Sequence, residues 1–121
     1  MDKKKEFINY LEKSSEEALH QEKKLILDER KDEANLVKIK NNIYNIFKIT
    51  FVSIIKNEKS GEVEIKSLFI EKLESIPKNW IASYEIAKLH NDAEKILIEE
   101  IKLQTLALIK TKFNEIWGDI A

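Results

Sequence analysis

The chain has 121 residues, enough for one domain that buries roughly two-thirds of its unfolded surface. Its 21 basic and 22 acidic residues nearly cancel and are mixed along the sequence, which argues against the one-sided positive field used to bind nucleic acids or anionic membranes. The absence of cysteine excludes disulfides, thiolate metal sites and a cysteine nucleophile, and it favours a reducing compartment such as the cytoplasm.

Composition also bears on the source and on membranes. Twenty lysines against one arginine, together with 19 isoleucines, indicate an AT-rich and therefore bacterial genome. Polar residues interrupt the first 13 residues and the apolar stretch 43–55, so neither matches a signal peptide or a membrane span. We expect a soluble cytoplasmic protein.

The first segment predicts an amphipathic helix. Projected at 100° per residue, its apolar and small residues fall in one sector about 120° wide. These residues are Phe7, Ile8, Leu11, Ser15, Ala18, Leu19, Leu25 and Ile26. The cap-like sequence Ser14-Ser15-Glu16-Glu17 predicts a break or kink inside this helix.

Glu22 lies in the middle of that apolar stripe. We expect the stripe to pass the end of a neighbouring helix there, so that the carboxylate reaches water. The alternative is a buried acid.

Two glycines and one proline leave little turn chemistry, so the rest of the chain predicts few, long helices. Apolar residues cover roughly half the circumference of segment 33–56 and an even wider arc of segment 92–118. Shorter helices are expected over 62–75 and 78–90, separated by the break at Ser75-Ile76-Pro77 and preceded by a loop over 57–61. Asn91, with Glu94 three residues on, predicts the N-cap of the last helix.

One alternative replaces helix by strand. Apolar and polar residues alternate on both sides of the 57–61 loop, and β-branched residues are frequent, which is typical of a β-hairpin over 49–69. The helical pattern runs through both arms without a breaker, so we favour an all-α, up-and-down bundle of four to five helices forming a single domain over 1–121.

Residues 83–103 resemble a helix-turn-helix DNA-binding segment, with EIAKL at 85–89, Asn91 in the turn and aliphatic residues Leu97 and Ile101 behind. The resemblance fails at Asp92, where the turn normally takes an apolar residue. The second helix, 92–103, would carry four acidic residues against two lysines, and phosphate repels such a probe. We therefore expect a capped helix boundary inside a bundle, and keep a DNA-binding regulator as the alternative function.

Glu17 and His20 have the Glu-x-x-His spacing used in di-iron four-helix bundles. His90 has Ala87 at the matching position, so a second motif is missing, and the first pair projects away from the apolar stripe. No nucleophile elbow or phosphate-binding loop occurs. We expect no cofactor, no metal and no catalysis; a ferritin-like metalloenzyme is the remaining alternative from these two residues.

The wide apolar arcs instead predict a protein-interaction or structural bundle. A monomer would leave part of segment 92–118 wet, so we expect a homodimer, or a complex with another protein, through this helix with 33–56 as second contributor. Trp80 is either a partner anchor or a filler between the short helices. The candidate interface residues are Leu103, Leu108, Ile109, Phe113, Trp117 and Trp80.

Overall fold

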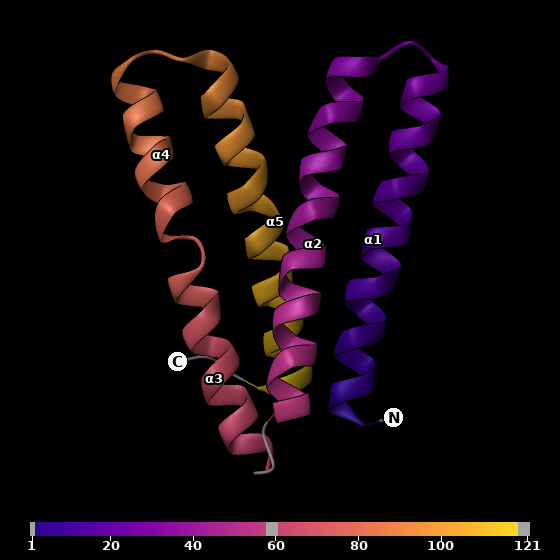
Figure 1. Ribbon diagram of the computed structural model, residues 1–121, viewed down its shortest axis with the longest axis vertical. Helices are drawn as coiled ribbons and strands as arrows, with labels where there is room; N and C mark the ends of the chain where they lie inside the picture. The colour runs from indigo at the N-terminus through magenta and orange to yellow at the C-terminus, as the bar shows by residue number, and fades with distance from the viewer. Residues whose placement is uncertain (1, 58–60, 119–121) are drawn as a thin grey trace.

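Five helical segments follow one another along the chain in the computed structural model, which describes residues 2–57 and 61–118. They are α1 (Lys3–Leu27), α2 (Lys31–Asn57), α3 (Glu62–Ser75), α4 (Lys78–Leu89) and α5 (Ala93–Trp117). Because α3 and α4 form one broken rod, the helices run up, down, up and down in a bundle of four members (Figure 1). The predicted all-α bundle is confirmed.

The β-hairpin alternative for 49–69 is wrong. Residues 49–57 belong to α2 and residues 62–69 belong to α3. The part of the predicted loop at 58–60 lies outside the described residues. Alternation of apolar and polar residues over a few positions fits both the strand period and the helix period. The helical pattern extends further along the chain on each side, and the segments are helical.

The first helix runs without the predicted break at Ser14–Glu17. It begins at Asp2, whose side chain accepts a hydrogen bond from the backbone N–H of Lys5 at 2.9 Å. The Ser15 hydroxyl does not cap a new helix, since it bonds to the side chains of Asn41 and Asn45 on α2. The cap-like sequence therefore serves a polar contact between two packed helices.

Both turns between antiparallel helices at the upper end in Figure 1 have the same construction. Glu29, with φ 60°, follows α1, and Asn91, with φ 52°, follows α4. In each turn the N–H of this residue and the N–H of the next residue donate backbone hydrogen bonds to carbonyls in the last turn of the preceding helix, as in a Schellman motif. The predicted N-cap at Asn91 is consequently one residue early: Asp92 caps α5 and accepts from the N–H of Lys95 at 3.2 Å.

The predicted break before Pro77 is confirmed. Proline has no N–H to donate and its ring crowds the preceding turn, so α3 ends at Ser75 and α4 begins at Lys78. The carbonyl of Pro77 accepts the hydrogen bond of Ile81 at 3.0 Å and starts the new helix.

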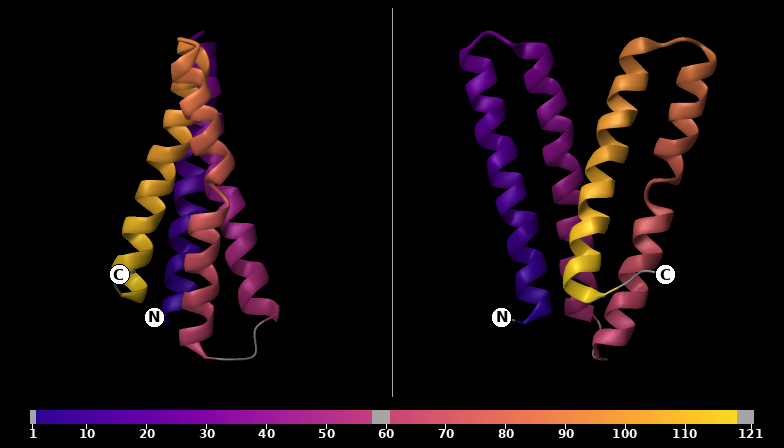
Figure 2. Two further views of the ribbon diagram at one scale, coloured as in Figure 1. Left: turned by 90° about the vertical axis from the view of Figure 1, so that its left-hand side faces the viewer. Right: turned by 180° about the vertical axis from the view of Figure 1, so that it is seen from behind.

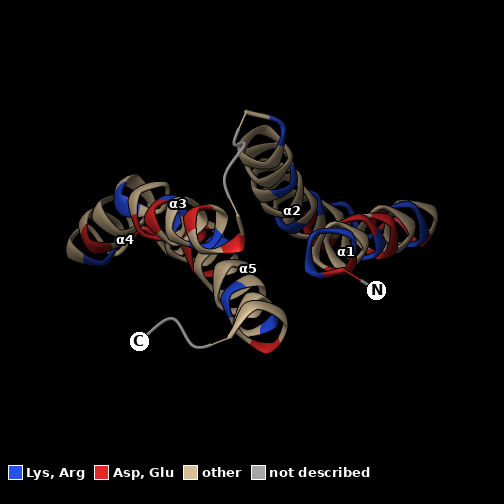
Figure 3. Ribbon diagram, turned by 90° about the horizontal axis from the view of Figure 1, so that it is seen from below, with Lys and Arg blue, Asp and Glu red and all other residues tan. Residues whose placement is uncertain are grey.

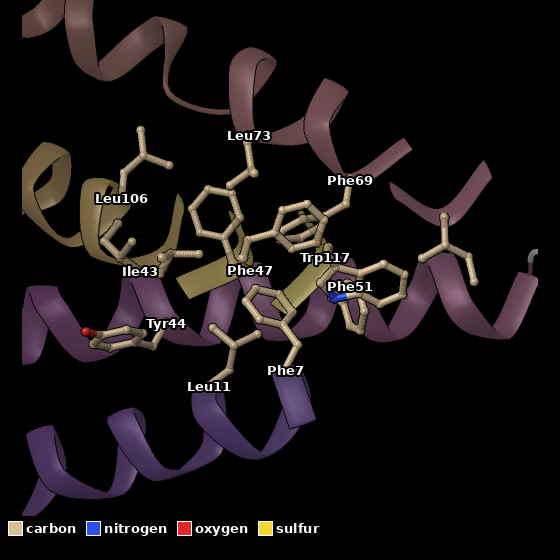
Figure 4. Packing of buried hydrophobic residues seen from close by; sticks show 13 residues of the cluster. Phe7, Leu11, Ile43, Tyr44, Phe47, Phe51, Phe69, Leu73, Leu106 and Trp117 are labelled. Carbon is tan, nitrogen blue, oxygen red and sulfur yellow. The ribbon is translucent and has the colours of Figure 1, made fainter. Parts of the chain in front are cut away.

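An aromatic cluster fills the bundle near its lower end, where α1, α2, α3 and α5 meet (Figure 4). Phe7 lies at its centre, with ring centroids 5.0 Å from Phe51, 5.3 Å from Phe69 and 5.2 Å from Phe113. All four side chains are fully buried. Edge-to-face contacts of this kind add to the free energy gained by burying the rings.

Away from this core the bundle opens. The α1–α2 hairpin and the hairpin made by α3, α4 and α5 diverge towards the end that carries the Glu29 and Asn91 turns, here called the open end (Figures 1 and 2). At this end α2 and α5 are the inner helices, while α1 and α4 lie outside them.

Charged residues, in contrast, are not segregated by sign on these helices. Seen from below, acidic and basic residues lie together on α1, α3 and α5 (Figure 3). Within the described ranges, no helix combines the length and apolar character needed to cross a bilayer.

Candidate functional site

The six residues predicted for the interface separate into three groups by burial. Ile109, Phe113 and Trp117 lie in the core of the single chain, at most 4% exposed, so none of them is open to a partner in this structure. Leu103 and Trp80 are partly buried against the same core. Only Leu108, at 49%, offers an exposed side chain.

The correction follows from helix packing. The sequence places two adjacent apolar bands on α5, and periodicity alone does not say which band meets the other helices. The band of Leu106, Ile109 and Phe113 faces the core, whereas Leu97 and Leu108 of the second band remain exposed. Trp80 fills a gap beside the core, edge to face with Phe47 at 6.3 Å between ring centroids.

At the open end a groove lies between α2 and α5, with a volume of about 460 Å³. Leu36 and Ile39 of α2 face Leu97 and Ile98 of α5 across it. The two hairpins diverge above the aromatic core (Figure 1), and three of these four side chains are partly buried while Leu97 is exposed. We call it the α2–α5 groove.

Two carboxylates, Asp32 and Glu94, lie on the upper rim of the α2–α5 groove, beside the neutral residues Asn35 and Ala93. Both acids stand in the first turn of their helices, where a negative charge is favoured by the helix dipole. No basic residue lines the groove. The groove therefore combines an apolar floor with an acidic rim.

Glu99, which follows the rim residue Glu94 on α5, is a buried acid. Its residue surface is 3% exposed, and Oε1 accepts from the Lys102 Nζ at 2.9 Å. Its second oxygen, Oε2, has no hydrogen-bond partner within the described part of the chain. Lys102 in turn lies 6.0 Å from the centre of the Trp80 ring.

The burial of Glu99 could have been predicted from its spacing in the sequence. It precedes Leu106 by one heptad and Phe113 by two, which puts it on the core-facing side of α5. The sequence singled out Glu22 instead. Glu22, in the middle of the apolar stripe of α1, is only partly buried, so it is not the fully buried acid of the alternative.

The candidate metal residues do not gather. Glu17 and His20 are both exposed on α1, as expected from their projection away from the apolar stripe. Over residues 2–57 and 61–118, no group of three or more histidine or acidic residues is arranged to hold an ion.

Residues 83–103 form the upper part of the α4–α5 hairpin (Figure 1). The two helices lie antiparallel and side by side, with Ala87 buried, whereas DNA-binding helix-turn-helix units cross at roughly 90–120°. Leu97, which would lock the second helix onto the first in such a unit, lines the groove towards α2. The geometry gives this segment a structural role in the bundle.

Comparison with protein-family models, with curated protein sequences and with solved structures finds no match for this chain. Fold and geometry alone thus define it as an all-α helical bundle with a groove between its inner helices at one end.

Proposed function

We propose that the protein is a non-enzymatic interaction or structural bundle that associates with itself, as a homodimer. The observation that carries the proposal is the α2–α5 groove, in which aliphatic side chains of α2 and α5 face one another and remain partly exposed. Its position supports an interaction surface because grooves between helices of bundles are common binding places.

Further exposed aliphatic residues support the same end of the molecule. Leu19, Ile26 and Leu27 on α1, and Ile86 and Leu89 on α4, are more than a third exposed in the half that carries the two turns. Soluble monomers rarely leave large contiguous apolar patches uncovered, and a two-fold dimer is the commonest way to cover one.

The proposed contact uses a different part of α5 from the one predicted from the sequence. The sequence pointed to Ile109, Phe113 and Trp117 in the second half of the helix, which the core already uses. The proposed contact lies in the first half, around Leu97. A cytoplasmic location belongs to the same proposal and rests on the composition, since a chain with no cysteine gains nothing from an oxidising compartment.

Light scattering after size exclusion tests the proposal. We expect about twice the 14.2 kDa chain mass at tens of micromolar protein. Leu97→Glu should convert the dimer to monomer while the helical circular dichroism signal is kept. Ile49→Glu, at a 70% exposed position on α2 near the opposite end, is the matched control and should stay dimeric. A wild-type mass near that of one chain would disprove self-association.

A further inference from the structure

The end of α1 has the chemistry that the α2–α5 groove lacks. Its last five residues are Lys23-Lys24-Leu25-Ile26-Leu27. Leu27, at 83%, is the most exposed large apolar side chain in the described part of the protein, and Ile26 is also about half exposed. Lys23 and Lys24 are exposed next to them. We call these residues the α1 tip.

The two lysines of the α1 tip and the two carboxylates of the groove rim are opposite in charge. Among residues 2–57 and 61–118, no salt bridge involves Lys23 or Lys24, and none involves Asp32 or Glu94. Asp28 and Glu29 follow Leu27 in the turn, so the match in charge with the acidic rim belongs to the lysine side of the α1 tip, one helical turn before Leu27.

The α1 tip does not reach the groove of its own chain. At the open end α1 lies on the side of α2 that faces away from α5, as both the front and the back views show (Figures 1 and 2). The helices α1 and α2 are packed together along their length, so α2 separates the tip from the groove. Contact between the two surfaces requires a second molecule.

We infer that the α1 tip of one copy docks on the α2–α5 groove of a second copy, and that a two-fold axis repeats the contact in the other direction. The inference rests on the proposed self-association and names its surface. Leu27 leaves water against Leu36 and Leu97, while Lys23 and Lys24 approach the rim carboxylates. Rim charges of this kind act mainly on the association rate and on specificity.

Cysteine cross-linking tests the contact, and the absence of native cysteine makes single substitutions clean. An affinity-tagged Leu27→Cys protein is mixed with untagged Leu97→Cys protein and oxidised. We expect the mixed disulfide to form at least ten times faster than a disulfide between Ile49→Cys and Leu97→Cys. Ile49 is the control because it is well exposed but lies on α2 towards the end of the bundle opposite the open end. Equal rates would overturn the inference.

Charge reversal gives an independent test. Lys23→Glu with Lys24→Glu in one variant, and Asp32→Lys with Glu94→Lys in another, should each weaken homodimerisation at least tenfold. Mixing the two variants should restore association, because a heterodimer pairs the reversed tip with the reversed rim and the native tip with the native rim. Circular dichroism and melting temperature of each variant show whether the fold survives.

The outcomes distinguish self-association from the docking of the α1 tip on the α2–α5 groove. A dimer by light scattering that forms no mixed Leu27→Cys to Leu97→Cys disulfide refutes this docking geometry and leaves self-association standing. A wild-type chain that remains near 14.2 kDa at several hundred micromolar refutes both. Variants that dimerise as well alone as in the mixture refute the charge pairing.

Discussion

Phe7 on α1 and Phe113 on α5 meet edge to face in the core, with ring centroids 5.2 Å apart and planes at 71°. The two residues come from opposite ends of the chain, so their contact closes the bundle. Both are fully buried, and α2 and α3 contribute the remaining rings around them.

Phe7→Ala should destabilise the protein by about 3–5 kcal/mol, because it removes a ring that contacts several others and leaves a cavity among them. The matched control is Leu19→Ala on the same helix, where the side chain is 44% exposed and the loss should stay below about 1 kcal/mol. Urea unfolding followed by circular dichroism measures both. Equal losses would mean that the aromatic cluster is not the stabilising core.

Replacing Glu99 by leucine should leave stability unchanged or raise it by up to about 1–4 kcal/mol, since a buried ion pair often contributes less than a packed apolar side chain. Lys102, whose side chain is 25% exposed, keeps access to water when its partner is lost. Lys102→Leu should instead cost about 3 kcal/mol, because it leaves the buried carboxylate without a cation. Thermal melting at neutral pH compares them; the reverse order of stabilities would contradict this account.

Glu29→Gly should stabilise the protein by about 0.5–1 kcal/mol. The backbone of Glu29 has φ 60°, a conformation that glycine adopts without the steric cost a Cβ brings. Asn91→Gly, at the equivalent position after α4, should gain less, because asparagine tolerates this conformation better than glutamate. Asp92→Ala next to it should lose about 1 kcal/mol with the helix cap. The three melting temperatures relative to wild type decide the order.

Tyr10 should make the protein lose stability in alkali. Its burial, followed by the neighbouring Tyr44, raises the pKa of Tyr10 above its ordinary value of 10.0. The unfolded chain therefore releases this proton first, so this contribution to stability is complete below about pH 10 and is lost as the pH rises towards the folded-state pKa. Tyr10→Phe should lose less stability than wild type between pH 9 and about pH 11.5, as measured by urea unfolding at fixed salt. Parallel curves for the two proteins would exclude Tyr10 as the cause.

The α4–α5 hairpin should not bind DNA. The first half of α5 carries more acidic than basic residues, and the hairpin lacks the crossing that presents a recognition helix. Electrophoretic mobility shift with a pool of duplexes at low salt checks this. Sub-micromolar, salt-dependent binding that disappears in Lys95→Ala with Lys102→Ala would contradict it.

Sequence alone determined the helices and most of their ends. The break at Pro77 follows from the missing N–H of proline, and the long α2 and α5 follow from apolar periodicity without a breaker. The exposure of Glu17 and His20 also followed from projection on one helix. These are local properties, because they depend on residues a few positions apart.

Only the tertiary structure decided which apolar residues are buried in the core of the single chain. Ile109, Phe113 and Trp117 lie in one apolar band of the helical projection and Leu97 and Leu108 in another, yet only the first band is buried. The tertiary structure also buries Glu99 and leaves the α2–α5 groove open. Helical periodicity ranks faces within one helix, whereas burial depends on how far apart the axes of neighbouring helices lie, and that distance is set by packing across the whole bundle.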